Sequence, residues 1–94
     1  MANLDITITA NTLKFVTNDL AESSGIVKSI WNINELQYVR LMNRPESHVE
    51  LAFLSSKKWP LTFDGAYGSQ VDTINGVAPT SNSDLFDKIA TVIG

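Results

Sequence analysis

The sequence predicts an α+β fold, in which a mostly antiparallel sheet of about six to seven short strands is followed by one C-terminal helix. Two observations lead to this prediction. Apolar and polar residues alternate in short runs along most of the chain, as in half-buried strands. Only the last segment, at about 83–93, spaces its apolar residues at the period of a helix. The 94 residues contain no linker and no internal repeat, so we expect a single domain, 1–94.

The first two strands are expected at residues 4–9 and 12–17, where apolar and polar residues alternate. Ala10-Asn11 between them is short enough for a tight turn, so the two runs predict a hairpin. The residues expected to face inward are Leu4, Ile6, Ile8, Leu13 and Phe15.

A second hairpin is expected from residues 26–33 and 36–42, with a turn at Asn34-Glu35. Strict alternation in the second run places Val39 and Leu41 on one face. The other face then carries Leu36, Tyr38, Arg40 and Met42.

Three further strands are expected at residues 48–54, 59–63 and 70–74. Pro60 has no amide hydrogen, which restricts its run to an edge strand or to the start of a strand. Asn75-Gly76 is a strong turn signal, because both residues tolerate positive φ.

The helix is expected to begin at Asp84, with Ser83 as its N-cap. About ten residues make a helix that is only marginally stable in water, so it must pack its apolar stripe on the sheet. That stripe consists of Leu85, Phe86, Ile89, Val92 and Ile93.

The order of elements, seven strands and then a helix, resembles that of the pleckstrin-homology-like superfold. This resemblance implies a partly closed barrel, although the chain has no counterpart of the basic phosphoinositide-binding loop. A plain antiparallel sheet or a small sandwich with the helix packed on one face is the alternative, and the sequence leaves closure open.

Composition excludes several classes of function. The net charge is −3 and the basic residues are scattered, so no nucleic-acid partner is expected. There is no cysteine, hence no disulfide and no thiolate metal site. We find no signal-like or membrane-spanning segment and expect synthesis in the cytoplasm, with no membrane partner.

No pattern of residues indicates catalysis, a cofactor or a metal. His48 is the single histidine, and Glu50 shares its face of a strand. This predicts a carboxylate–imidazole pair on the surface rather than a catalytic general base. The segment 64–72 has an aspartate at each end but lacks the alternating ligands of a calcium loop. The sequence therefore predicts a protein that is not an enzyme and has no evident small-molecule substrate.

Binding to a protein partner, or self-association, is a function that the sequence favours over catalysis. Lys57, Lys58, Trp59 and Pro60 place two cations and an indole where a loop meets a strand, and Tyr67 lies in a glycine-containing loop. We take these five residues as candidate contacts, since tryptophan and cationic anchors are common in interfaces. The alternative for Trp59 is a place in the core beside Leu61 and Phe63.

The C-terminal residues 74–94, INGVAPTSNSDLFDKIATVIG, resemble the ends of small tailed-bacteriophage proteins of unknown function. The resemblance implies a virion or assembly component: a capsid decoration, head-tail or tail-associated protein. The sequence therefore predicts a non-enzymatic structural or interaction protein, and the resemblance implies that it is incorporated into a virion. The alternative is a small peptide- or ligand-binding domain with a pleckstrin-homology-like fold.

Overall fold

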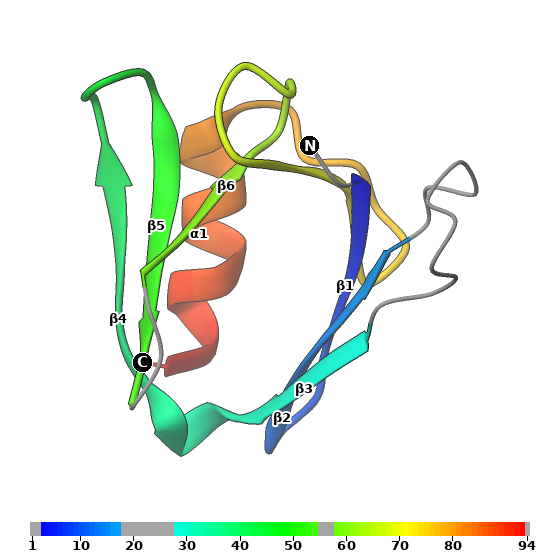
Figure 1. Cartoon of the computed structure of the whole chain (residues 1–94). Coiled ribbons are helices and arrows are strands. Elements are labelled where there is room, and N and C mark those ends of the chain that lie inside the picture. The colour runs from blue at the N-terminus through cyan, green and yellow to red at the C-terminus, as the bar shows by residue number, and fades with distance from the viewer. Residues whose placement is uncertain (1–2, 18–27, 55–57, 94) are drawn as a thin grey trace.

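The computed structural model describes residues 3–17, 28–54 and 58–93. Within these residues seven strands form one sheet, and one α-helix follows them, as the sequence predicts (Figure 1). The elements are β1 (Asn3–Ile8), β2 (Thr12–Thr17), β3 (Lys28–Asn32), the 3₁₀ turn η1 (Ile33–Glu35), β4 (Leu36–Met42), β5 (His48–Phe53), β6 (Trp59–Thr62), β7 (Ser69–Ile74) and α1 (Asn82–Ile93).

The sheet consists of two antiparallel pieces joined by a parallel strand. Its order is β3-β2-β1-β7-β6-β5-β4, and β7 runs parallel to both of its neighbours, β1 and β6. The sheet is strongly curved but does not close into a barrel, because β3 and β4 remain its two end strands (Figure 1). The parallel pairings at β7 are a feature that alternation alone does not reveal.

One predicted hairpin is confirmed and the other is wrong. β1 and β2 pair antiparallel, with Ile6 opposite Phe15. β3, however, pairs with β2, and β4 pairs with β5, so β3 and β4 lie at opposite ends of the sheet. The physical reason is that residues 33–35 form η1 instead of a hairpin turn. There the Glu35 carboxylate accepts the Asn32 amide hydrogen at 3.2 Å, which holds the chain in a 3₁₀ turn.

A register shift in β4 changes the face of one predicted residue. The pairing with β5 slips between Leu36 and Tyr38, as in a β-bulge. Leu36 therefore joins the hydrophobic core, on the same side as Val39, while Tyr38 and Arg40 lie on the other face. Strict alternation placed Leu36 with Tyr38 and is wrong at this residue.

β6 is an interior strand between β5 and β7, although it contains Pro60. Pro60 lies opposite Glu50 of β5, and the ladder to β7 begins one residue later, at Leu61. Pro60, which has no amide hydrogen to donate, thus lies before the first residue of that ladder. The expectation of a strand start is confirmed, whereas that of an edge strand is wrong.

Two glycine turns hold β7 in place. Gly68 has a φ of 75°, and a Cβ atom there would lie 2.5 Å from the carbonyl oxygen of Pro60, so only glycine fits. After β7, Asn75 and Gly76 adopt φ of 50° and 83° and form the predicted turn. The Asn75 side chain accepts the amide hydrogen of Ile8 at 2.8 Å, which fastens this turn to β1.

The core lies between the curved sheet and α1. The helix packs against β4 and β5 and buries Leu85 and Ile89 completely, as its apolar stripe predicts. Phe53 of β5 joins the two pieces of the sheet. Its ring stacks on Trp31 of β3 with centroids 4.5 Å apart and meets the edge of Phe15 of β2 at 6.2 Å. The remaining buried core residues are Leu4, Ile6, Leu13, Leu36, Val49, Leu51, Ala52, Leu61, Val71 and Ile74.

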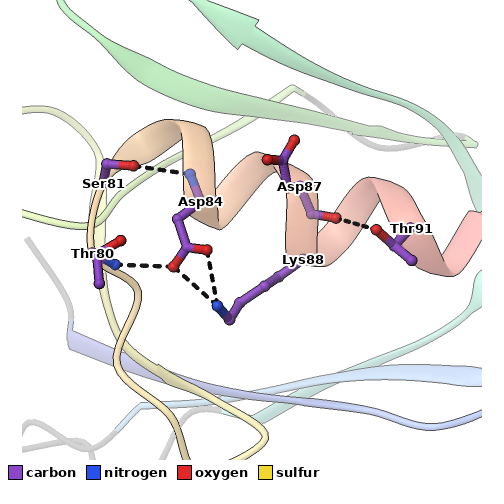
Figure 2. A network of polar contacts seen from close by, with 6 residues as sticks. All are labelled: Thr80, Ser81, Asp84, Asp87, Lys88 and Thr91. Carbon is purple, nitrogen blue, oxygen red and sulfur yellow. Dashed lines mark hydrogen bonds and ion pairs between the residues drawn. The ribbon is translucent and has the colours of Figure 1, made fainter.

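The helix begins two residues earlier than the sequence predicts. Ser81, not Ser83, is the N-cap: its Oγ accepts the Asp84 amide hydrogen at 3.0 Å, and its carbonyl accepts that of Leu85 at 2.9 Å (Figure 2). Asp84 is then the third helical residue. Its carboxylate accepts hydrogen bonds from Lys88 Nζ and from the Thr80 amide, which together lower the pKa of Asp84 below its ordinary value of 3.8.

Candidate interaction surface

Of the five predicted contact residues, the structure describes four: Lys58, Trp59, Pro60 and Tyr67. Lys57 lies outside the described residues, and Lys58 is exposed. Trp59 packs inward: its ring lies 4.8 Å from that of Phe15 and 6.3 Å from that of Phe53. Trp59 is thus partly buried and packs against the core, as its alternative interpretation expects, and β6 has strand neighbours on both sides. Pro60 contacts the loop at Gly68.

Tyr67 covers a buried histidine. Its ring lies 4.5 Å from that of His48, which is only 4% exposed. His48 Nδ1 is 2.7 Å from the carbonyl oxygen of Glu46, and because a carbonyl can only accept, Nδ1 carries the proton. The predicted surface pair between His48 and Glu50 is therefore wrong. Glu50 instead accepts the hydroxyl hydrogen of Tyr38 at 3.0 Å.

Asn82, which the sequence did not single out, fixes the end of the sheet near Tyr67. It is buried, and its amide nitrogen donates to the carbonyl and the hydroxyl oxygen of Ser47 at 3.0 and 3.1 Å. Its side-chain oxygen accepts the amide hydrogen of Phe63 at 3.0 Å. Three segments far apart in the sequence are joined by this one side chain. An asparagine in a polar stretch before a helix gives no sign of such partners, so sequence reasoning had no signal for it.

Asp64 closes the turn that follows β6. Its carboxylate accepts the Thr62 hydroxyl hydrogen at 2.7 Å and the Ala66 amide hydrogen at 3.0 Å. The Thr62 hydrogen bond, and after it the Ala66 amide, lower the pKa of Asp64 below its ordinary value of 3.8. This geometry gives Asp64 a turn-forming role, and within the described residues no three acidic or histidine side chains gather as a metal site requires.

The outer face at β4 carries a small cluster of charged and aromatic side chains. The Arg40 guanidinium lies 4.0 Å above the centre of the Tyr38 ring, and the Tyr38 hydroxyl donates to Glu50. Arg40 lies opposite Glu50 in the register, yet it forms no ion pair within the described residues. Beside it on the other face, Leu41 is 42% exposed. This cluster lies on an end strand, where the backbone has no strand neighbour on its outer side among the described residues.

The other end strand, β3, also exposes an apolar side chain. Ile30 is 64% exposed and lies opposite Lys14 of β2. Exposed backbone donors and acceptors beside an apolar side chain are the usual template for pairing with another chain. Both ends of the sheet are thus candidate contact elements, at places that sequence reasoning did not select.

One shallow depression of about 480 Å³ lies where the β1–β2 turn meets η1. Its lining is mostly amide side chains around one isoleucine: Ala10, Asn11, Asn32, Ile33 and Asn34. The Ile33 amide donates to the Asn11 carbonyl at 2.8 Å, which holds the two walls together. The lining residues that the structure describes offer amide and main-chain hydrogen bonds.

Comparisons with known proteins give no neighbour for this chain: no family model, no curated protein and no solved structure matches it. No helix in the part of the chain that the structure describes is long and apolar enough to cross a membrane.

Proposed function

We propose that this protein is a non-enzymatic structural component that acts by protein–protein contact, with an end strand of its sheet as the contact element. The observation that supports this proposal is the open sheet, whose end strands β3 and β4 expose Ile30 and Leu41. An added strand from another chain would gain main-chain hydrogen bonds along either edge and would cover these side chains.

Within this class we favour a bacteriophage virion or assembly component, such as a capsid decoration, head-tail or tail-associated protein. The resemblance of residues 74–94 to the ends of small phage proteins supports this choice. The low share of charged residues, 18%, also suits a surface that meets other protein subunits. In a repeated assembly one kind of edge contact is used many times, so even a short strand is sufficient.

Light scattering over micromolar to near-millimolar concentrations tests the contact element. We expect the native chain to associate and a charge at the contacting edge, Ile30→Lys or Leu41→Lys, to abolish association. Val77→Lys is the matched control, because Val77 is 57% exposed but lies on neither end strand.

The virion assignment has its own test. Mass spectrometry of particles and assembly intermediates purified from the encoding phage should find the chain at a fixed ratio to the other subunits. A chain that stays monomeric at every concentration, and that is absent from particles and intermediates alike, would overturn the proposal.

The alternative function, a small peptide- or ligand-binding domain, has one observation in its favour. The depression at η1 has a volume within the range of about 300–1,000 Å³ that is common for small-molecule sites. Its lining is more polar than such sites usually are, and none of the five lining residues named above belongs to α1. A thermal-shift screen against peptides and lipid headgroups tests it, and a rise in melting temperature that Asn34→Ala removes would favour it over the structural role.

A further inference from the structure

We propose that β4 pairs with β4 of a second copy of this chain, antiparallel and with Val39 opposite Val39. This inference rests on the proposed function and names both the edge and the partner. It makes one continuous sheet across a two-fold axis, which is a common way for two identical chains to form a closed, self-complementary contact.

The choice of β4 over β3 follows from its surroundings. All seven residues of β4 are described, and they offer a continuous row of main-chain donors and acceptors. The inner face of β4 already packs on α1, which holds the strand in place before any partner arrives. A strand that is ordered beforehand loses less conformational entropy on binding.

The register follows from the side chain that each pairing places opposite Arg40. In antiparallel pairing, directly opposite residues point to the same face of the sheet. Across a two-fold axis one residue of β4 must therefore lie opposite its own copy, with the axis between the two, and the axis is named by that residue. An axis at Arg40 puts two guanidinium groups face to face, which is destabilising. An axis at Tyr38 puts Arg40 opposite Leu36, which the register shift has turned toward the core.

An axis at Val39 gives Arg40 favourable neighbours on both sides. Within its own chain Arg40 lies opposite Glu50. Across the axis it would lie opposite Tyr38 of the second copy, whose hydroxyl is already bonded to a carboxylate. Arginine already contacts Tyr38 in this way within one chain, at 4.0 Å. On the other face, Leu41 would be covered by Gln37 of the second copy.

Cysteine cross-linking measures this register directly, because the native chain has no cysteine. Directly opposite residues of antiparallel strands have Cα atoms about 4.5–5.5 Å apart, a distance that a disulfide spans. We expect Val39→Cys alone to form a disulfide-linked dimer under mild oxidation. Leu41→Cys and Gln37→Cys should form no disulfide-linked dimer alone and should cross-link when the two variants are mixed.

A charge reversal tests the same contact without a cysteine. Arg40→Glu would place a carboxylate opposite Tyr38 and near Glu50, and we expect it to weaken dimerisation by about tenfold or more, since two such pairs are lost by symmetry. Arg44→Glu is the matched control, because it makes the same change of charge at an exposed residue outside β4, and it should leave the dimer unchanged. Far-UV circular dichroism of each variant checks that the fold is intact.

Three other outcomes would each overturn the proposed pairing of β4 at Val39, and each points to a different alternative. Faster cross-linking by Arg40→Cys than by Val39→Cys would place the axis at Arg40. A dimer that Ile30→Lys abolishes and Arg40→Glu leaves intact would make β3 the contact strand, and the proposed function would still stand. A native chain that stays monomeric at all concentrations but is found in purified particles would overturn the β4 pairing alone.

Discussion

At the scale of single residues, the two glycine turns beside β7 show how the space around a Cβ atom decides whether alanine can replace glycine. Gly68 and Gly76 share nearly the same φ, 75° and 83°. Their surroundings differ, since a Cβ at Gly68 would overlap the Pro60 backbone, whereas one at Gly76 would meet nothing within 4 Å. A side chain at either position would therefore strain the backbone, but only a side chain at Gly68 would also overlap the Pro60 backbone.

We expect Gly68→Ala to destabilise the fold clearly more than Gly76→Ala. Positive φ costs each alanine about 1–2 kcal/mol. Gly68→Ala must also push the Pro60 backbone aside, and an overpacked contact adds roughly 1–3 kcal/mol. Urea denaturation of both variants measures the difference. Equal midpoints would mean that the loop moves freely away from Pro60.

The helix start offers a second matched pair. We expect Ser81→Ala to lower the free energy of unfolding by about 0.5–2 kcal/mol, because the Asp84 amide loses its capping partner. Ser83→Ala should change it by no more than about 0.5 kcal/mol, since Ser83 is exposed and caps nothing. Thermal unfolding of the two variants compares them, and a larger effect at Ser83 would restore the cap that the sequence alone predicted.

At the scale of elements, α1 depends on the sheet beneath it. The cap and the Lys88–Asp84 ion pair do not stabilise the helix sufficiently by themselves, because an isolated helix of twelve residues remains marginal in water. Burial of Leu85 and Ile89 against the core supplies the remaining stabilisation of the helix. Helix and core should therefore be lost together when the apolar contact is weakened.

We expect Leu85→Ala to cost about 2–5 kcal/mol, the range for a cavity left by a fully buried leucine. Asp87→Ala, at an exposed position on the same helix, should cost no more than about 0.5 kcal/mol. Chemical denaturation followed by circular dichroism gives both values. A small cost for Leu85→Ala would mean that the helix does not depend on this contact.

At the scale of the whole molecule, the aromatic contacts of Phe53 tie the two antiparallel pieces into one core. Trp31 belongs to the piece that contains β3, and Trp59 to the piece that contains β6, yet both contact the Phe53 ring. The parallel strand β7 joins the same two pieces through the backbone. A molecule connected in this way should unfold as one unit.

We therefore expect a single unfolding transition with coincident probes. Tryptophan fluorescence reports on the aromatic core and far-UV circular dichroism on strands and helix, and their urea midpoints should agree. Single-tryptophan variants, Trp31→Phe and Trp59→Phe, allow each piece to be followed separately. Two distinct midpoints would show that the pieces unfold independently.

The sequence by itself determined the features that depend on neighbouring residues. The period-2 runs located the seven strands, the Asn75-Gly76 turn was recognised from its two residues, and the stripe through Leu85 and Ile89 showed that the helix packs on the sheet. Each of these signals is contained within a few consecutive residues, so periodicity and turn chemistry are sufficient to find them.

Only the tertiary structure decided which strands become neighbours, and with them the candidate contact surface. The 3₁₀ turn at 33–35 sends β3 and β4 to opposite ends of the sheet, and β7 pairs parallel between the two pieces. As a result Trp59 packs, partly buried, against the core, while Arg40 and Ile30 lie on end strands. Pairing joins residues far apart in the sequence, and its free energy comes from burial across the whole core, which no local pattern of residues contains.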